Sequence, residues 1–128
     1  MADEDRPDSG RKRRRLSRSG DFDRVYREGD SRGNRFLVVY SFARGEDDRG
    51  EDPRLGISVG RKIGKAVTRN KVKRTVREAF WDLAGDLPGG NDYVIVARPG
   101  VEGLVEREGG GGVRTQLVEL LSDEERLS

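Results

Sequence analysis

The residues with the clearest chemistry are nine arginines and lysines within one 24-residue segment, positions 54–77. No acidic residue interrupts this segment. Nine of the 26 basic residues lie in it, which leaves 17 basic and 24 acidic residues in the rest of the chain. The net charge of +2 therefore hides a strongly cationic segment in an otherwise acidic chain. Such a polarised distribution is typical of proteins that bind a polyanion, most commonly a nucleic acid.

The spacing of these cations predicts a row along one side of a helix over residues 66–83. The apolar positions in this range fall within about a third of the helical circumference; they are Val72, Val76, Ala79, Phe80 and Leu83. Arg69, Lys73 and Arg77 follow one another every four residues beside that stripe, about 6 Å apart, which is close to the phosphate spacing of a nucleic-acid strand. Between residue 54 and Glu78 no acidic residue neutralises them, so we expect an external anion to do so.

The composition excludes several kinds of catalytic site. The chain has no histidine, so a Ser-His-Asp triad and a histidine-bearing metal site are ruled out. It has no cysteine, which excludes disulfides and thiolate metal sites. No apolar run approaches the roughly 18 residues of a membrane span, and no apolar stretch typical of a signal peptide follows the N-terminal charges. We therefore expect a cytoplasmic location and no membrane contact.

Two elements ahead of the basic segment carry aromatic side chains. Phe22, Val25 and Tyr26 recur at helical spacing, which predicts a short helix ending near Gly29. From the spacing alone, these rings are more often core than a ligand platform. Residues 34–43 form the first clear strand, in which two sets of side chains alternate between the faces: Phe36, Val38, Tyr40 and Phe42 on one face, and Leu37, Val39 and Ser41 on the other.

The remaining segments complete the predicted fold. An acidic loop at 44–53 is expected to join the first strand to a second at 54–60 as an antiparallel hairpin. Residues 92–97 form a nearly continuous apolar strand that is typical of a sheet centre. A flexible glycine run at 109–112 precedes a closing helix at 113–121. The order helix, two or three strands, helix, strand, helix predicts an α+β sandwich with helices on one side of the sheet.

The domain organisation predicted by composition is a single folded unit. Residues 1–15 are expected to be a disordered basic N-terminal arm, because acidic residues are followed there by the unbroken basic run at 11–15. Residues 16–121 form the domain, and residues 122–128 form a polar tail.

Residues 54–80 resemble a known signature. The pattern R-L-G-I-S-V-x-[K/R]-K-x-G-K-A-V-x-R-N-x-x-K-R-x-x-R-E-A-F is similar to that of the bacterial ribonuclease P protein component. The R-L-S-R-S-G-D-F-D-R-V-Y-R-x-G stretch resembles the family's first helix, and D-Y-V-I-V-A-R-P-G resembles its last strand. The resemblance covers most of residues 14–121.

This resemblance implies a fold and a function. The fold would be a two-layer α/β sandwich of order α-β-β-β-α-β-α, like domain 2 of ribosomal protein S5, with a left-handed β-α-β crossover. The activity would be endonucleolytic removal of the 5′ leader of precursor tRNA, catalysed by a large RNA subunit that holds Mg²⁺. The implied partners are that catalytic RNA and precursor tRNA, with no obligate protein partner.

The resemblance also implies two sets of site residues, none of them catalytic or metal-binding. The RNA-binding set comprises Arg61, Lys62, Lys65, Arg69, Asn70, Lys71, Lys73, Arg74 and Arg77. The cleft for the 5′ leader would use Phe22, Tyr26, Phe36 and Tyr40. Lys71 stands where the family usually has arginine, so the charge is kept but the bidentate geometry is lost.

Two other functions stay open as alternatives. One is a general RNA-binding or ribosomal-protein-like module without a catalytic partner. The other is a protein-only nuclease, which would need a carboxylate cluster for two-metal chemistry, whereas the acidic residues here fall mainly in predicted loops and tails. The sequence also leaves open the oligomeric state, any direct contact between protein and Mg²⁺, and the roles of the basic run, the acidic loop and the glycine run.

Overall fold

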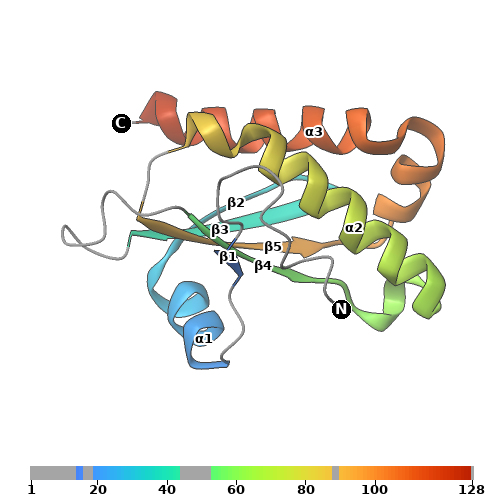
Figure 1. Cartoon of the computed structure of the whole chain (residues 1–128), viewed down its shortest axis with the longest axis horizontal. Coiled ribbons are helices and arrows are strands. Elements are labelled where there is room, and N and C mark those ends of the chain that lie inside the picture. The colour runs from blue at the N-terminus through green and yellow to red at the C-terminus, as the bar shows by residue number, and fades with distance from the viewer. Residues whose placement is uncertain (1–13, 16–18, 44–52, 88–89, 128) are drawn as a thin grey trace.

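A computed structural model of the chain describes residues 14–15, 19–43, 53–87 and 90–127 (Figure 1). Its five-stranded sheet has the order β1-β4-β5-β3-β2. The strands are β1 (Arg14–Arg15), β2 (Asp30–Gly33), β3 (Leu37–Ala43), β4 (Arg54–Ser58) and β5 (Asn91–Ala97). The helices are α1 (Ser19–Glu28), α2 (Ala66–Leu83) and α3 (Val101–Leu127), with 3-10 turns at Arg61–Ile63 and Ala84–Asp86.

Strand β5 lies at the centre of the sheet, as its continuous apolar sequence predicts. It runs parallel to β4 and antiparallel to β3, and it separates these two strands. The predicted hairpin between β3 and β4 is therefore wrong. Strand β5 is apolar on both faces. Such a strand is best shielded from water at the centre of a sheet, where a strand pairs with it on each side. The acidic loop predicted to close that hairpin falls largely outside the described residues.

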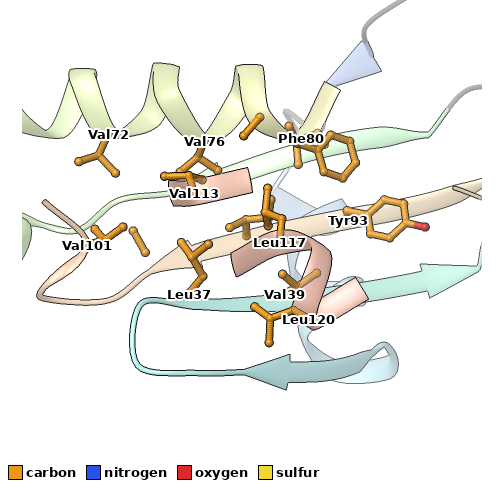
Figure 2. Packing of buried hydrophobic residues seen from close by; sticks show 14 of the residues in the cluster. Leu37, Val39, Val72, Val76, Phe80, Tyr93, Val101, Val113, Leu117 and Leu120 are labelled. Atoms are coloured by element: carbon orange, nitrogen blue, oxygen red, sulfur yellow. The ribbon is translucent and has the colours of Figure 1, made fainter. Parts of the chain in front are cut away.

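The two long helices and α1 cover opposite faces of the sheet (Figure 1). Helices α2 and α3 pack over the main core, to which Leu37, Val76 and Leu117 contribute from three different elements (Figure 2). Helix α1 covers the other face, where Val25 and Val94 are fully buried against each other. The α+β class and the predicted order of helices and strands are confirmed. The prediction that all the helices lie on one side is wrong for α1.

The connection from α1 into the sheet depends on a glycine. The amide of Gly29 donates to the carbonyl of Val25, and a Cβ at Gly29 would lie 2.4 Å from the carbonyl oxygen of Ser41. Helix α1 therefore ends in direct contact with the backbone of β3. The chain then enters β2, an edge strand of polar sequence that hydrophobic patterning does not detect.

Helix α3 includes the glycine run that was expected to be a flexible connection. The segment is helical on both sides of Gly109, whose φ of 63° and ψ of −149° break the helix there. Gly112 permits a close approach, since a Cβ at that position would lie 2.6 Å from the Cβ of Glu108. The expectation of a flexible loop is thus wrong, and the glycines instead form a sharp bend within α3.

The termini of the predicted domain are only partly described. Residues 1–13 of the expected basic arm lie outside the described residues, while Arg14–Arg15 pairs in parallel with the start of β4, although the arm was expected to be disordered through residue 15. The β4–α2–β5 unit implied by the resemblance is present, and the handedness of its crossover stays a prediction. None of the described helices is both long enough and apolar enough to span a membrane.

Candidate RNA interface

A cationic loop leads from β4 into α2. Arg61 and Lys62 are exposed on the 3-10 turn, while Ile63 is buried and anchors that turn in the core. Gly64 follows with a φ of 153°, a conformation that residues with a side chain rarely adopt. Arg69 donates from Nε to the carbonyl of Gly64 across 3.1 Å, which fixes the loop to the first turns of α2. The loop cations therefore stand at a defined position beside the helix.

Helix α2 separates its apolar stripe from its cations as the sequence predicts. Val72, Val76 and Phe80 are almost completely buried against the sheet and α3. On the outside, seven of the predicted RNA-binding residues, on the helix and at its N-cap, are exposed or half-buried. The exposed ones are Lys65, Asn70, Lys71 and Arg74, and the half-buried ones are Arg69, Lys73 and Arg77. All nine predicted cationic and amide positions thus lie on the loop and helix surface.

The N-terminus of α2 increases the positive potential of this surface. Its N-cap is Lys65, which makes no side-chain capping hydrogen bond, and the first turn contains no acidic residue. The unpaired amides and the helix dipole therefore add to the side-chain charges instead of being neutralised by them. This combination of charges slightly destabilises the free protein and favours the binding of an anion.

One side chain on this surface was not predicted. Val67 in the first turn of α2 is 81% exposed, between the cationic loop and the cation row. The surface that α2 offers is therefore not purely cationic. The exposure of Val67 could have been predicted from the helical phase, because this residue lies outside the apolar stripe.

A second surface is formed by aromatic side chains between α1 and the sheet. The rings of Phe22 and Tyr26 lie 6.4 Å apart, and Tyr26 meets Tyr40 edge-to-face at 4.9 Å. Val25, Val94 and the partly buried Phe42 and Val96 pack with them. Three of the four predicted cleft residues, Phe22, Tyr26 and Tyr40, are thus brought together. We call these three rings the aromatic surface.

Phe36 does not belong to the aromatic surface. It precedes β3 and packs against the main core on the α2 and α3 side, with the guanidinium of Arg35 5.3 Å from its ring centre. Strand alternation places it with Tyr40, but regular β3 begins only at Leu37. Phe42, which was not predicted as a site residue, contributes instead. Its position two residues after Tyr40 is the signal that identifies it.

Tyr26 combines exposure with partial desolvation. Its side chain is 39% exposed, and burial of the rest raises the pKa of its phenol above the usual 10.0, against a side-chain hydrogen bond with Ser58 that lowers it. Tyr40 and Asp23 raise it further. The phenol therefore stays neutral at physiological pH, and the ring is partly open to solvent, as a stacking platform for an unpaired base requires.

Sequence comparison identifies relatives with one common name. A family model described as ribonuclease P matches residues 11–115. A relative named ribonuclease P protein component, from Streptococcus pyogenes serotype M49, is 45% identical over 94 residues. The aligned region covers 73% of this chain and 75% of that protein.

Solved structures with the same fold carry the same name. The ribonuclease P protein of Staphylococcus aureus superimposes with a TM-score of 0.73 and 32% identity, covering 88% of this chain and 96% of that one. The ribonuclease P protein of Thermotoga maritima gives a TM-score of 0.70 and 41% identity, covering 85% and 96% of the two chains.

Proposed function

The chain belongs to the family of bacterial ribonuclease P protein components, and from this membership we propose that it binds the catalytic RNA and the 5′ leader of precursor tRNA. Family membership places the chain in an endoribonuclease complex of tRNA processing, whose protein component acts together with an RNA. We assign each of the two RNA segments to one of the chain's two surfaces.

The cationic loop and α2 are proposed to dock on the catalytic RNA. Exposed cations such as Lys71 and Arg74 neutralise phosphates, and the uncapped start of α2 adds backbone donors. Half-buried Arg69 and Arg77 have less freedom, so they hold a phosphate in a fixed position rather than following a mobile one. This surface would recognise the charge and shape of the RNA, with little preference for its sequence.

The aromatic surface is proposed to hold the single-stranded leader. Every base has a π-face, so stacking on Phe22, Tyr26 or Tyr40 tolerates the sequence variation among leaders. Each stacked base contributes about 1–3 kcal/mol. Mature tRNA has no leader and loses this contribution, which makes the aromatic surface a means of distinguishing substrate from product.

The reaction itself is proposed to be catalysed by the RNA subunit, which would also hold most of the Mg²⁺. The protein's residues bind and orient the two RNAs. Across the described parts of the chain, no three potential metal-binding side chains gather in one place. The buried carboxylate of Asp92 is engaged by the guanidinium of Arg54 through hydrogen bonds of 2.9 Å, which leaves it a poor ligand for a metal ion.

One observation supports this division most strongly. The cations of α2 and the aromatic rings of α1 belong to helices on opposite faces of a single sheet. Two surfaces of such different chemistry, presented by one small domain, suit two RNA segments of different kinds. A general RNA-binding module without a catalytic partner, the main alternative, gives no reason for a substrate-specific second surface.

The test compares two substrates in the complex with the catalytic RNA. Tyr26→Ala should weaken affinity for precursor tRNA by roughly 5- to 150-fold, corresponding to the loss of one stacked base, and leave affinity for mature tRNA unchanged. Arg74→Ala serves as the matched control, because it should weaken assembly with the catalytic RNA and leave the preference for the leader intact. Equal losses for the two tRNAs in Tyr26→Ala would remove the leader assignment and favour the general RNA-binding alternative.

A further inference from the structure

A buried carboxylate lies beneath α1 on the face of the sheet that carries the aromatic surface. Asp92 in β5 is completely buried. Arg54, its directly paired neighbour in β4, donates from Nε and Nη2 to the two carboxylate oxygens, each across 2.9 Å. This bidentate pair is the strongest geometry that an arginine and a carboxylate adopt. It fixes the position of the carboxylate within the sheet.

Arg24 connects this carboxylate to α1. Its Nη2 lies 3.6 Å from Oδ2 of Asp92, and its guanidinium carbon lies 5.4 Å from the ring centre of Phe42 in β3. The side chain of Arg24 is 38% exposed, so it lies between solvent and the buried carboxylate. One residue of α1 thus contacts groups that belong to two different strands.

The strand register places Arg24 and Tyr26 over different rows of the sheet. Phe42, Asp92 and Arg54 form one cross-strand row. Tyr40 and Val94 form the next row, and Ser58 pairs with Val96 in the row after that.

Helix α1 lies across these rows with Val25 at its centre. Val25 packs on Val94, Arg24 reaches the charged row, and Tyr26 reaches Tyr40 and Ser58. Residues 24 and 26 each lie about 100° from Val25, on opposite sides of the helix. A rotation of α1 about its axis would therefore move Arg24 and Tyr26 together.

We propose that Arg24, Asp92 and Arg54 form a positioning clamp that fixes the rotation of α1 and thereby holds Tyr26 in the orientation that receives a leader base. The small apolar contact of Val25 with Val94 secures α1 to the sheet but does not define its angle, because two aliphatic side chains have no preferred direction. The bidentate Arg54–Asp92 pair and its contact with Arg24 do have a preferred direction. The inference rests on the proposed function, since it concerns the orientation of the leader surface.

The clamp is a device for orientation rather than for stability. Buried ion pairs often contribute little net stability, because desolvation of the two charges offsets their attraction. Arg24 is the informative position to change. It is partly exposed, and the Arg54–Asp92 pair stays intact without it, so the fold should survive the substitution.

The experiment uses the complete complex with the catalytic RNA and three variants. Arg24→Gln removes the link to α1. Arg27→Gln is the matched control, because it removes the same charge from an exposed position on the same helix. Arg24→Lys keeps an ion pair with Asp92 and should restore most of the function. The readouts are the ratio of affinities for precursor and mature tRNA, the affinity for the catalytic RNA, and the NMR titration of ¹³C-labelled Tyr26.

The clamp predicts a defect confined to the leader. Arg24→Gln should reduce the preference for precursor over mature tRNA by roughly fivefold or more, the contribution of one weakly stacked base, with unchanged affinity for the catalytic RNA. The pKa of Tyr26 should fall towards 10, because a rotated ring loses its burial against the sheet. Asp92→Asn, whose side chain is too deeply buried to touch RNA, should produce the same pattern if it folds.

Three results would overturn the clamp. In the first, Arg24→Gln keeps the full preference for precursor over mature tRNA. In the second, it loses no more of this preference than Arg27→Gln does. In the third, it loses the preference while the Tyr26 titration stays at its wild-type position. The last result would mean that Arg24 contacts the leader directly. A wild-type protein without any preference for precursor tRNA would instead refute the proposed function, so the two failures are distinguishable.

Discussion

At the scale of single residues, the cations of α2 divide into two kinds. Arg74 is exposed and available to a phosphate, whereas Arg69 already donates to the carbonyl of Gly64. Residue type and helical phase place both in the same surface, whereas the grouping of Tyr26 with Tyr40 was implied only by the family resemblance. The phase does not predict which cation also has an intramolecular bond, because that depends on the path of the preceding loop.

Arg74→Ala should change the salt dependence of binding to the catalytic RNA. Loss of one phosphate contact removes its released counterions, so the slope of log affinity against log salt concentration should flatten by about 0.7–0.9 units. Filter binding between about 0.05 and 0.3 M salt measures this slope. Thermal unfolding of the variant should match the wild type, since the side chain is exposed. A slope identical to that of the wild-type protein would mean that Arg74 faces no phosphate.

Arg69→Ala should combine two effects. It removes a cation, and it also frees the carbonyl of Gly64 that holds the loop against α2. The free energy of unfolding should fall by about 1 kcal/mol, the usual contribution of one hydrogen bond. Chemical denaturation of Arg69→Ala beside Arg74→Ala measures the difference. Equal stabilities would show that the bond to Gly64 contributes nothing to the fold.

Tyr26 should ionise at a higher pH than free tyrosine. Burial raises the pKa of its phenol above 10.0 in the folded protein. The folded state therefore holds the phenolic proton more tightly than the unfolded state, so this group's stabilising contribution is complete below pH 10 and is lost as the pH rises through the folded-state pKa. The difference in absorbance at 295 nm between wild type and Tyr26→Phe follows the titration. A midpoint below pH 10 would contradict the partial burial of this ring.

At the scale of elements, the start of the basic helix does not stabilise the free fold as well as a capped helix would. Lys65 occupies the N-cap without a capping bond, and α2 begins with cations near the positive end of its dipole. Hydrophobic periodicity predicts most of its apolar stripe, but Trp81, outside the predicted stripe, is buried as well, and Leu83 is only partly buried. The order of the strands in the sheet was not predicted, because β5, although it comes last in the sequence, lies between β3 and β4.

Lys65→Asn should stabilise the free protein and weaken the complex. Asparagine is a favoured N-cap that bonds to the amides of the first turn, which contributes about 1 kcal/mol. The same change removes one cation from the proposed interface. Thermal unfolding and affinity for the catalytic RNA should therefore move in opposite directions. A variant that is no more stable, or that binds as tightly as the wild type, would contradict this account of the helix start.

Phe80→Ala should test how α2 is anchored. Phe80 is completely buried, with Trp81 5.1 Å and Tyr93 5.3 Å from it between ring centres. Removing the ring leaves a cavity in the main core and should lower the free energy of unfolding by about 3–5 kcal/mol. Urea denaturation measures the loss. A loss below about 1 kcal/mol would mean that the core collapses into the space and that α2 does not depend on this contact.

At the scale of the whole molecule, one sheet separates the cationic surface of α2 from the aromatic surface beside α1. Outside residues 54–77 the chain has 17 basic and 24 acidic residues, so positive charge is concentrated in α2, its loop and the basic run at 11–15. The opposite position of α1 could not be predicted from composition, because the apolar stripe of a helix does not specify which face of a sheet it covers. Under the proposed function, this placement would allow the catalytic RNA and the leader to be bound at the same time.

Reconstitution tests this central claim most directly. The purified protein, the catalytic RNA of a bacterial ribonuclease P and a precursor tRNA are combined with Mg²⁺, and release of the 5′ leader is followed with and without each component. We predict no cleavage by the protein alone, and faster cleavage at limiting Mg²⁺ when the protein joins the RNA. Cleavage by the protein alone, or no effect of the protein on cleavage by the RNA, would contradict the account.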